Sequence, residues 1–277
     1  MSKHVAIGNQ LAFFGFVDSL GFLTGSATSA PANGVVSDMI RLTGIQQATP
    51  GLPEGTDVSV QGDDDVIATM SFQPDSTPAF VANFGVEDMA TQALLQSTLT
   101  EDDAGYTYGV LQPEDPAFNN GCAILQSRSI SQDEADQGLE IWSGMIFPLI
   151  VAQPLGRESF NYREAGVFRT KFTAQKASHR PTGVTISDAV LGTTGASIIN
   201  FRGYHPLRMV RITGDGAETT FTLPKAVANT GRIAAFVATQ KLTHGAGITA
   251  VADSTSLVFA SAPAAGAKVI VVYGFVP

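Results

Sequence analysis

The sequence predicts a mainly β protein: a β-sandwich or barrel body with one α-helix and a long arm, followed by a small C-terminal β-sandwich module. Its 28 glycines and 14 prolines fall at short, irregular intervals and divide the apolar residues into short runs. Several of these runs alternate apolar and polar residues, as half-buried strands do. Only 15% of the 277 residues are charged, against about 25% in an average soluble domain, which excludes a disordered chain.

Two stretches show the strand pattern most clearly. Residues 57–61 and 66–73 alternate on either side of Gly62-Asp63-Asp64-Asp65, which predicts a β-hairpin with an acidic turn. In residues 167–175, Phe168 and Phe172 fall on one face of the expected strand, and basic residues fall on the other. The two phenylalanines are therefore expected to point into a core.

Two segments interrupt the β pattern. Residues 86–99 place apolar side chains at helical spacing behind Glu87 and Asp88, acids that suit a helix N-terminus, and so predict one amphipathic helix. Residues 133–139 are a second candidate, for a helical turn. Residues 24–56 are rich in small and turn-forming residues, and so long a weakly structured stretch is unusual in a compact monomer. They predict an arm that orders against another subunit, or a mobile surface loop.

The chain divides near Tyr204-His205-Pro206 into a body, residues 1–204, and a terminal module, residues 205–277. Short β segments separated by turns run through the module, which indicates a small β-sandwich. No internal repeat relates the two parts.

Charge is distributed unevenly along the chain. Residues 1–150 carry three basic and nineteen acidic residues, a net charge of -16, whereas residues 151–277 carry thirteen and six, a net charge of +7. An acidic surface of one subunit could meet a basic surface of the next, although two domains with unlike surfaces would give the same asymmetry. The low charge content leaves much neutral surface, as on a subunit surrounded by neighbours.

The sequence offers no catalytic, cofactor or metal site, and we expect a protein that is not an enzyme. It contains no G-x-S-x-G elbow, no P-loop and no EF-hand spacing, and Cys122 alone can form neither an intrachain disulfide nor a cysteine-based metal site. The histidines stand apart from one another and from other metal ligands: His4, His179, His205 and His244.

Membrane and secretion signals are also not expected. The longest apolar candidate, residues 145–152, is far shorter than the roughly 18 residues of a membrane span and contains Pro148. No secretory signal is evident, and the single cysteine is consistent with assembly in a reducing cytosol.

Two acidic clusters remain, Asp63-Asp64-Asp65 and Glu101-Asp102-Asp103. Each could be a solvated turn. Alternatively, they could line a surface that repels the phosphates of a nucleic acid, so that a polyanion passes without binding, as in a conduit. Basic residues are not interleaved with exposed aromatic residues, which argues against a nucleic-acid reader.

The terminal module carries the most specific local motifs. Gly214-Asp215-Gly216 precedes a strand that ends Thr220-Phe221-Thr222-Leu223, and a late A-P-A-A-G turn, residues 262–266, precedes a final strand that ends in Tyr273. This arrangement resembles small Ig-like β-modules of tailed-bacteriophage virion proteins. Where such modules often show a V-x-V-N-G hairpin, this chain has F-V-A-T-Q at residues 236–240. The side chains expected to alternate into the core are Phe221, Leu223, Phe259 and Val271.

The body resembles a major tail tube protein of a long-tailed phage in its layout. The resemblance rests on a strand-rich body, one helix after a central strand, a long arm between early strands, and the late run 168–177 followed by Pro181-Thr182-Gly183. It implies a β-sandwich or barrel whose copies join edge to edge into a hexameric ring, with rings stacked by the arm. It also implies a negatively charged lumen for DNA, with Asp63, Asp64 and Asp65 as the candidate carboxylates near the lumen or a ring contact.

The implied setting is a virion tail, built from a chain synthesised in the cytoplasm of a bacterial host. Its partners would be copies of itself and other tail proteins (tape measure, terminator and distal tail proteins), with transient, non-specific passage of DNA and no cofactor. Deleting residues 24–56 should then spare folding and stop polymerisation, and removing residues 207–277 should leave tubes with thinner walls.

Other protein classes stay open. A capsid, capsid decoration or baseplate protein could carry the same terminal module. A glycan-binding or glycan-cleaving surface protein is a further alternative, although one Trp and five Tyr give little surface for stacking on sugars.

Overall fold

The structure is a computed structural model, and it describes residues 4–6, 11–42, 45–51, 56–62, 65–72, 79–84, 100–103, 106–110, 120–131, 141–157, 168–188, 193–238 and 240–277. These residues are mainly β, with one short 3-10 helix, η1 (Thr230–Arg232), and two main sheets, one of them nearly barrel-shaped. The predicted fold class is thus confirmed at this level. The helix expected at residues 86–99 and the helical turn expected at residues 133–139 lie outside the described residues.

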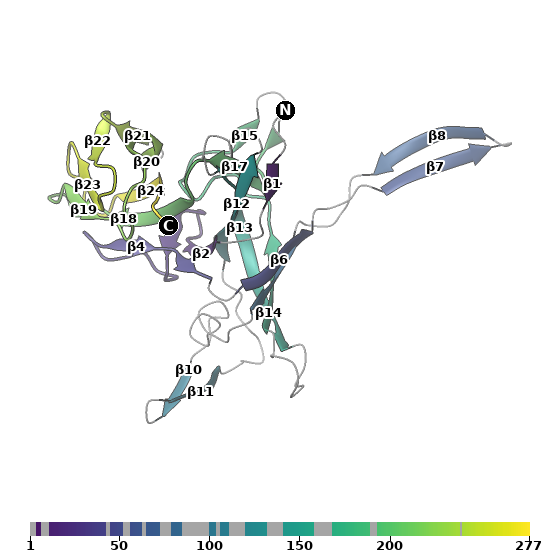
Figure 1. Ribbon diagram of the computed structural model, residues 1–277, viewed down its shortest axis with the longest axis horizontal. Coiled ribbons are helices and arrows are strands. Elements are labelled where there is room, and N and C mark those ends of the chain that lie inside the picture. The colour runs from purple at the N-terminus through teal and green to yellow at the C-terminus, as the bar shows by residue number, and fades with distance from the viewer. Residues whose placement is uncertain are drawn as a thin grey trace.

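The first main sheet has ten strands and forms the body (Figure 1). Its strands are β1 (His4–Ala6), β2 (Leu11–Val17), β3 (Leu23–Gly25), β5 (Ile40–Arg41), β6 (Ile45–Gly51), β9 (Ala79–Phe84), β12 (Asn120–Ser131), β13 (Ile141–Arg157), β14 (Phe168–Ala174) and β17 (Ile199–Gly203). The hydrogen-bonded path runs β3-β2-β12-β13-β14-β9-β6, with β1 beside β12, β17 beside β13 and β5 beside β2. All of these pairings are antiparallel.

Aromatic packing shows that this sheet is strongly curved. The ring centroids of Phe14 on β2 and Phe172 on β14 lie 6.3 Å apart, although β12 and β13 separate these two strands in the sheet. Phe80 on β9 stacks on the same Phe172 ring at 4.6 Å. Phe172 is fully buried, as the alternation in residues 167–175 predicted, and the side chains of Arg169 and Lys171 are only partly buried.

The second main sheet has eight strands and includes one from the N-terminal part of the chain. Its strands are β4 (Val36–Asp38), β18 (Leu207–Thr213), β19 (Thr220–Thr222), β20 (Ile233–Val237), β21 (Gln240–His244), β22 (Gly247–Ala250), β23 (Ser256–Phe259) and β24 (Lys268–Gly274). They follow the order β19-β23-β22-β21-β20-β24-β18-β4. Because β4 pairs antiparallel with β18, from Val36↔Ile212 to Val210↔Asp38, residues 36–38 complete the edge of the terminal sheet.

The strands β3, β4 and β5 correct the prediction of a free arm over residues 24–56. Each of them pairs with a strand of the same chain. Thr24, Met39 and Leu42 are buried, and burial of the two apolar side chains offsets part of the entropy lost on ordering the segment. Deleting residues 24–56 is therefore expected to damage both sheets rather than to spare the body.

The two glycine-containing turns of the terminal module lie against each other. The Gly214 N–H donates to the Ala267 carbonyl at 2.9 Å, and the Gly216 N–H donates to the Pro263 carbonyl at 3.0 Å. Gly216 has φ +85°, a backbone conformation that favours glycine. Backbone N–H groups that donate to the Asp215 carboxylate lower its pKa. The side chains predicted to form the core behind these turns are all buried: Phe221, Leu223, Phe259 and Val271.

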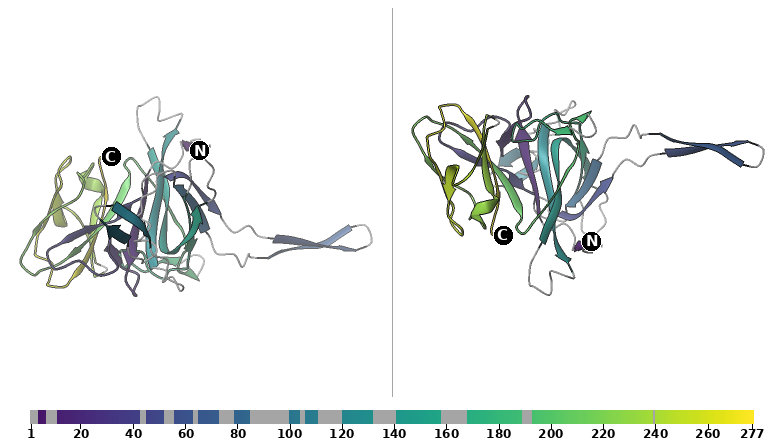
Figure 2. Two further views of the ribbon diagram at one scale, coloured as in Figure 1. Left: turned by 90° about the horizontal axis from the view of Figure 1, so that it is seen from below. Right: turned by 90° about the horizontal axis from the view of Figure 1, so that it is seen from above.

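Three two-stranded sheets complete the described structure. They are β7 (Thr56–Gly62) with β8 (Asp65–Phe72), β10 (Thr100–Asp103) with β11 (Tyr106–Val110), and β15 (Ser187–Asp188) with β16 (Thr193–Thr194). The β7–β8 register, Thr56↔Phe72 through Gly62↔Asp65, confirms the predicted hairpin. In both views of Figure 2 this hairpin lies well away from the two main sheets, on the side of the body opposite the terminal sheet.

Candidate functional site

The body sheet and the terminal sheet share one apolar core. Side chains on alternate positions of β2 enter different clusters: Phe13 packs in the cluster that contains Met209 and Ile212 of β18, whereas Phe14 packs inside the curved body sheet. A strand covered on both faces is apolar throughout, which explains the uninterrupted sequence LAFFGFV of β2. The terminal module is therefore not peripheral, because it covers one apolar face of the body.

A buried glutamine connects the two parts where the sequence appeared to divide. Gln126 on β12 is fully buried, and its Nε2 donates to the Leu207 carbonyl at 2.9 Å. The Leu207 N–H donates back to Gln126 Oε1 at 2.7 Å. The reciprocal pair satisfies the amide without water and fixes the start of β18 against the body.

An arginine–aspartate pair fastens β4 to the terminal sheet. Arg208 Nε donates to Asp38 Oδ1 at 2.9 Å, and its Nη2 makes a second, short contact with Asp38 Oδ2. The Arg208 guanidinium also lies over the rings of Phe13 and Phe275, at 5.2 and 5.4 Å from their centroids. A two-point ion pair held between aromatic rings fixes orientation as well as distance.

A second group of charges surrounds Asp18, in the turn after β2. Lys268 Nζ donates to Asp18 Oδ2 at 2.8 Å, and Arg211 Nη1 lies 3.9 Å from the same oxygen. The Leu20 and Phe22 N–H groups donate to Asp18 Oδ1. Burial alone would raise the pKa of Asp18, but the hydrogen bonds from Lys268 and the backbone outweigh it, and the pKa lies below its ordinary value.

The lowered pKa of Asp18 gives a pH-dependent prediction. Ionised Asp18 should stabilise the folded state above the ordinary aspartate pKa of 3.8, and this contribution should disappear as the pH falls through the lower folded-state pKa. Asp18→Asn keeps the acceptor for the backbone N–H groups and removes the charge. We expect it to lower the free energy of unfolding by about 1 kcal/mol or less at pH 7, because partly exposed pairs are screened. In urea unfolding, the difference from wild type should shrink as the pH falls below 3.8; a difference that does not shrink would contradict the assignment.

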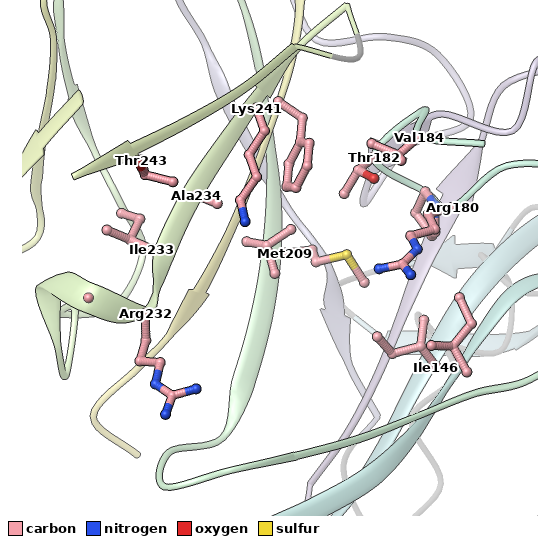
Figure 3. A pocket seen from close by; sticks show the side chains of 15 residues that line it. Ile146, Arg180, Thr182, Val184, Met209, Arg232, Ile233, Ala234, Lys241 and Thr243 are labelled. Carbon is pink, nitrogen blue, oxygen red and sulfur yellow. The ribbon is translucent and has the colours of Figure 1, made fainter. Parts of the chain in front are cut away.

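A cleft of about 480 Å³ opens between the body and the terminal sheet. Its apolar lining comes from both parts, with Ile146 on β13 and Met209 on β18 among the side chains shown in Figure 3. Three basic side chains also line it, Arg180, Arg232 and Lys241, and none of its described lining residues is acidic. The cleft thus combines an apolar surface with positive charge.

The described residues of the acidic clusters lie on two of the hairpins that are separate from the main sheets, β7–β8 and β10–β11. Asp65 begins β8, and its neighbours Asp63 and Asp64 lie outside the described residues. Glu101, Asp102 and Asp103 lie in β10. The predicted position of Asp63, Asp64 and Asp65 near a lumen or ring contact stays a prediction.

No metal-binding group of three His, Cys, Asp or Glu occurs within the described ranges. His179 Nδ1 lies 2.8 Å from Ser178 Oγ, and His244 Nδ1 accepts the Ala250 N–H at 3.2 Å. Cys122 is fully buried, and burial raises the pKa of its thiol to about 12, which suppresses thiolate chemistry at neutral pH. In the described part of the chain, no helix is long and apolar enough to cross a membrane.

Sequence reasoning missed the charged residues at the junction of the two sheets. A signal was present: Asp18 and Asp38 are the only acids among the first fifty residues, and Arg208 and Arg211 interrupt an apolar strand. Isolated charges in apolar surroundings are rarely buried unless they are paired.

Comparison of the sequence with protein-family models and with curated proteins found no match to either.

Proposed function

We propose that this chain is a structural subunit that assembles with copies of itself into the tail tube of a phage. The tube would consist of stacked rings, hexameric as the resemblance implies, that form a conduit for DNA ejection. The observation that carries the proposal is the β7–β8 hairpin, which pairs with no other strand in the described part of the chain and lies away from both cores. A two-stranded hairpin by itself is only marginally stable in water. A second copy of the chain would supply the surface that it lacks.

The open edges of the body sheet support the same proposal. Its hydrogen-bonded path ends at β3 and β6, which leaves strand edges available for pairing among the described residues. Proteins usually cover such edges or use them for assembly, and closure of a ring removes them. The strand-rich body and the packed G-D-G and A-P-A-A-G turns support the resemblance to tail tube proteins and their Ig-like modules.

The proposal includes the virion tail as the location, other tail proteins as partners and non-specific passage of DNA, with Asp63, Asp64 and Asp65 near the lumen or at a ring contact. It assigns no catalytic activity. The terminal module keeps an Ig-like character in this proposal, but it stabilises the body as well as decorating it, because the two sheets share a core.

Negative-stain electron microscopy of the purified full chain, over a range of concentrations, tests the proposal. We expect rings or hollow tubes, with the scattered light rising with polymer length. A variant in which residues 56–72 are replaced by a short Gly-Ser linker should keep its circular dichroism melt and stay monomeric. A wild-type chain that stays monomeric at millimolar concentration would contradict the tube assignment, and tubes of unchanged length from the variant would contradict the role of the hairpin.

A further inference from the structure

We propose that the cleft between the two main sheets receives the acidic β7–β8 hairpin of a neighbouring copy of this chain. This inference rests on the proposed function, because both require self-association, and it assigns the two surfaces that meet.

The three basic side chains of the cleft have no carboxylate partner within the described ranges. Arg180, Arg232 and Lys241 form none of the ion pairs in that part of the chain, and the Arg232 guanidinium lies over the Tyr204 ring, 5.8 Å from its centroid. By contrast, Arg208 and Lys268 at the same junction are paired with aspartates. Three unpaired cations around one cleft of an acidic chain create a local positive potential that an anionic partner would satisfy.

The shape of the cleft favours an extended partner over a single small anion. In Figure 3 the Arg180 and Arg232 side chains lie on opposite sides of the cleft, with Met209 and Lys241 between them. The apolar side chains of Met209, Ile233 and Ile146 form much of the surface between these charges. A segment that carries both carboxylates and apolar side chains complements this surface.

The β7–β8 hairpin has this composition. Residues 56–72 contain four aspartates, Asp57, Asp63, Asp64 and Asp65, and no lysine, arginine or histidine. Apolar residues alternate along both strands, for example Val58 and Val60 on β7. A negatively charged hairpin with apolar side chains therefore matches a positively charged apolar cleft.

The contact has to join two copies of the chain. The hairpin lies on one side of the body and the terminal sheet that lines the cleft lies on the other, in Figure 1 and in both views of Figure 2. A hairpin of one copy in the cleft of the next makes a head-to-tail interface, which closes into a ring or continues as a helical filament. The contact thus produces ordered assembly without a second kind of subunit.

Charge reversal on each surface tests the contact with the full chain. The cleft variant is R232E/K241E and the hairpin variant is D63K/D64K. Each is expected to raise the concentration needed for assembly at least tenfold, measured by light scattering, while the thermal melt stays unchanged. Mixing the two variants should restore assembly. The native hairpin of the cleft variant meets the native cleft of the hairpin variant, and the reversed charges of the other two surfaces complement each other again. K176E/K225E, two reversals at exposed lysines outside the cleft, should assemble like wild type.

The outcomes separate this contact from the proposed function. Suppose that wild type forms tubes. If both variants then form tubes equally well, or if mixing the two variants does not restore assembly, the contact is wrong and the tube assignment stands. If wild type does not polymerise, oxidative cross-linking still tests whether the hairpin binds in the cleft. K241C mixed with D64C should give a disulfide-linked dimer, whereas S261C mixed with D64C should not, and buried Cys122 does not compete. A K241C cross-link to D102C instead, or none at all, would overturn the choice of this hairpin.

Discussion

A chain that ends at Tyr204 is expected to lose cooperative folding rather than to yield an intact body without its terminal module. The truncation removes the strands that cover Phe13, Ile124 and Trp142, and it leaves Gln126 without the backbone of Leu207. Each large apolar side chain returned to water costs about 1.5–3 kcal/mol, and a whole domain is stable by only about 5–15 kcal/mol. Circular dichroism melts and binding of a hydrophobic dye should show a collapsed, aggregating chain.

The hairpin deletion over residues 56–72 is the matched control for this truncation. It removes two strands that pair only with each other among the described residues, so its melting temperature should stay within a few degrees of wild type. A cooperative melt from the truncated chain, at a temperature near that of wild type, would show that the body is stable without the terminal sheet.

Asp38→Leu is expected to lower the free energy of unfolding by about 3 kcal/mol, because it leaves the Arg208 guanidinium largely buried and unpaired. The cost lies at the lower end for broken buried pairs, since the side chain of Asp38 is 25% exposed. Urea unfolding monitored by the fluorescence of Trp142 measures the change directly.

The double variant Asp38→Leu with Arg208→Met supplies the control. It replaces both charged side chains by apolar ones, and such replacements of a buried ion pair are often close to neutral. We therefore expect it to recover most of the stability lost in the single variant. Equal destabilisation by the single and double variants would mean that the cost comes from strand packing and not from the unpaired charge.

The parts of the fold that the sequence predicted are those set by local pattern. The β7–β8 hairpin could be predicted because its turn and the alternation of its strands lie within one short segment. The alternating core of the terminal module could be predicted for the same reason, as the burial of Phe221 and Phe259 shows. Neither inference required knowledge of a distant partner.

The parts of the fold that were not predicted depend on pairing between residues that lie far apart in the sequence. The strand β4 is only three residues long, and its Asp38 pairs with Arg208, 170 positions later in the chain. A segment so rich in small residues gives no local sign of such a pairing, which is why residues 24–42 looked like an arm. The cleft was not predicted for a similar reason, since Arg180 lies in a turn, Arg232 in η1 and Lys241 on β21.

The late pairing of β4 has a consequence for folding during synthesis. Residues 36–38 leave the ribosome long before β18 is made, so the terminal sheet cannot close until nearly the whole chain has been translated. The apolar outer face of the body stays uncovered for the same period, and contacts of such large sequence separation form slowly. An incomplete chain therefore lacks a finished cleft, and a growing polymer built through that cleft would incorporate only full-length subunits.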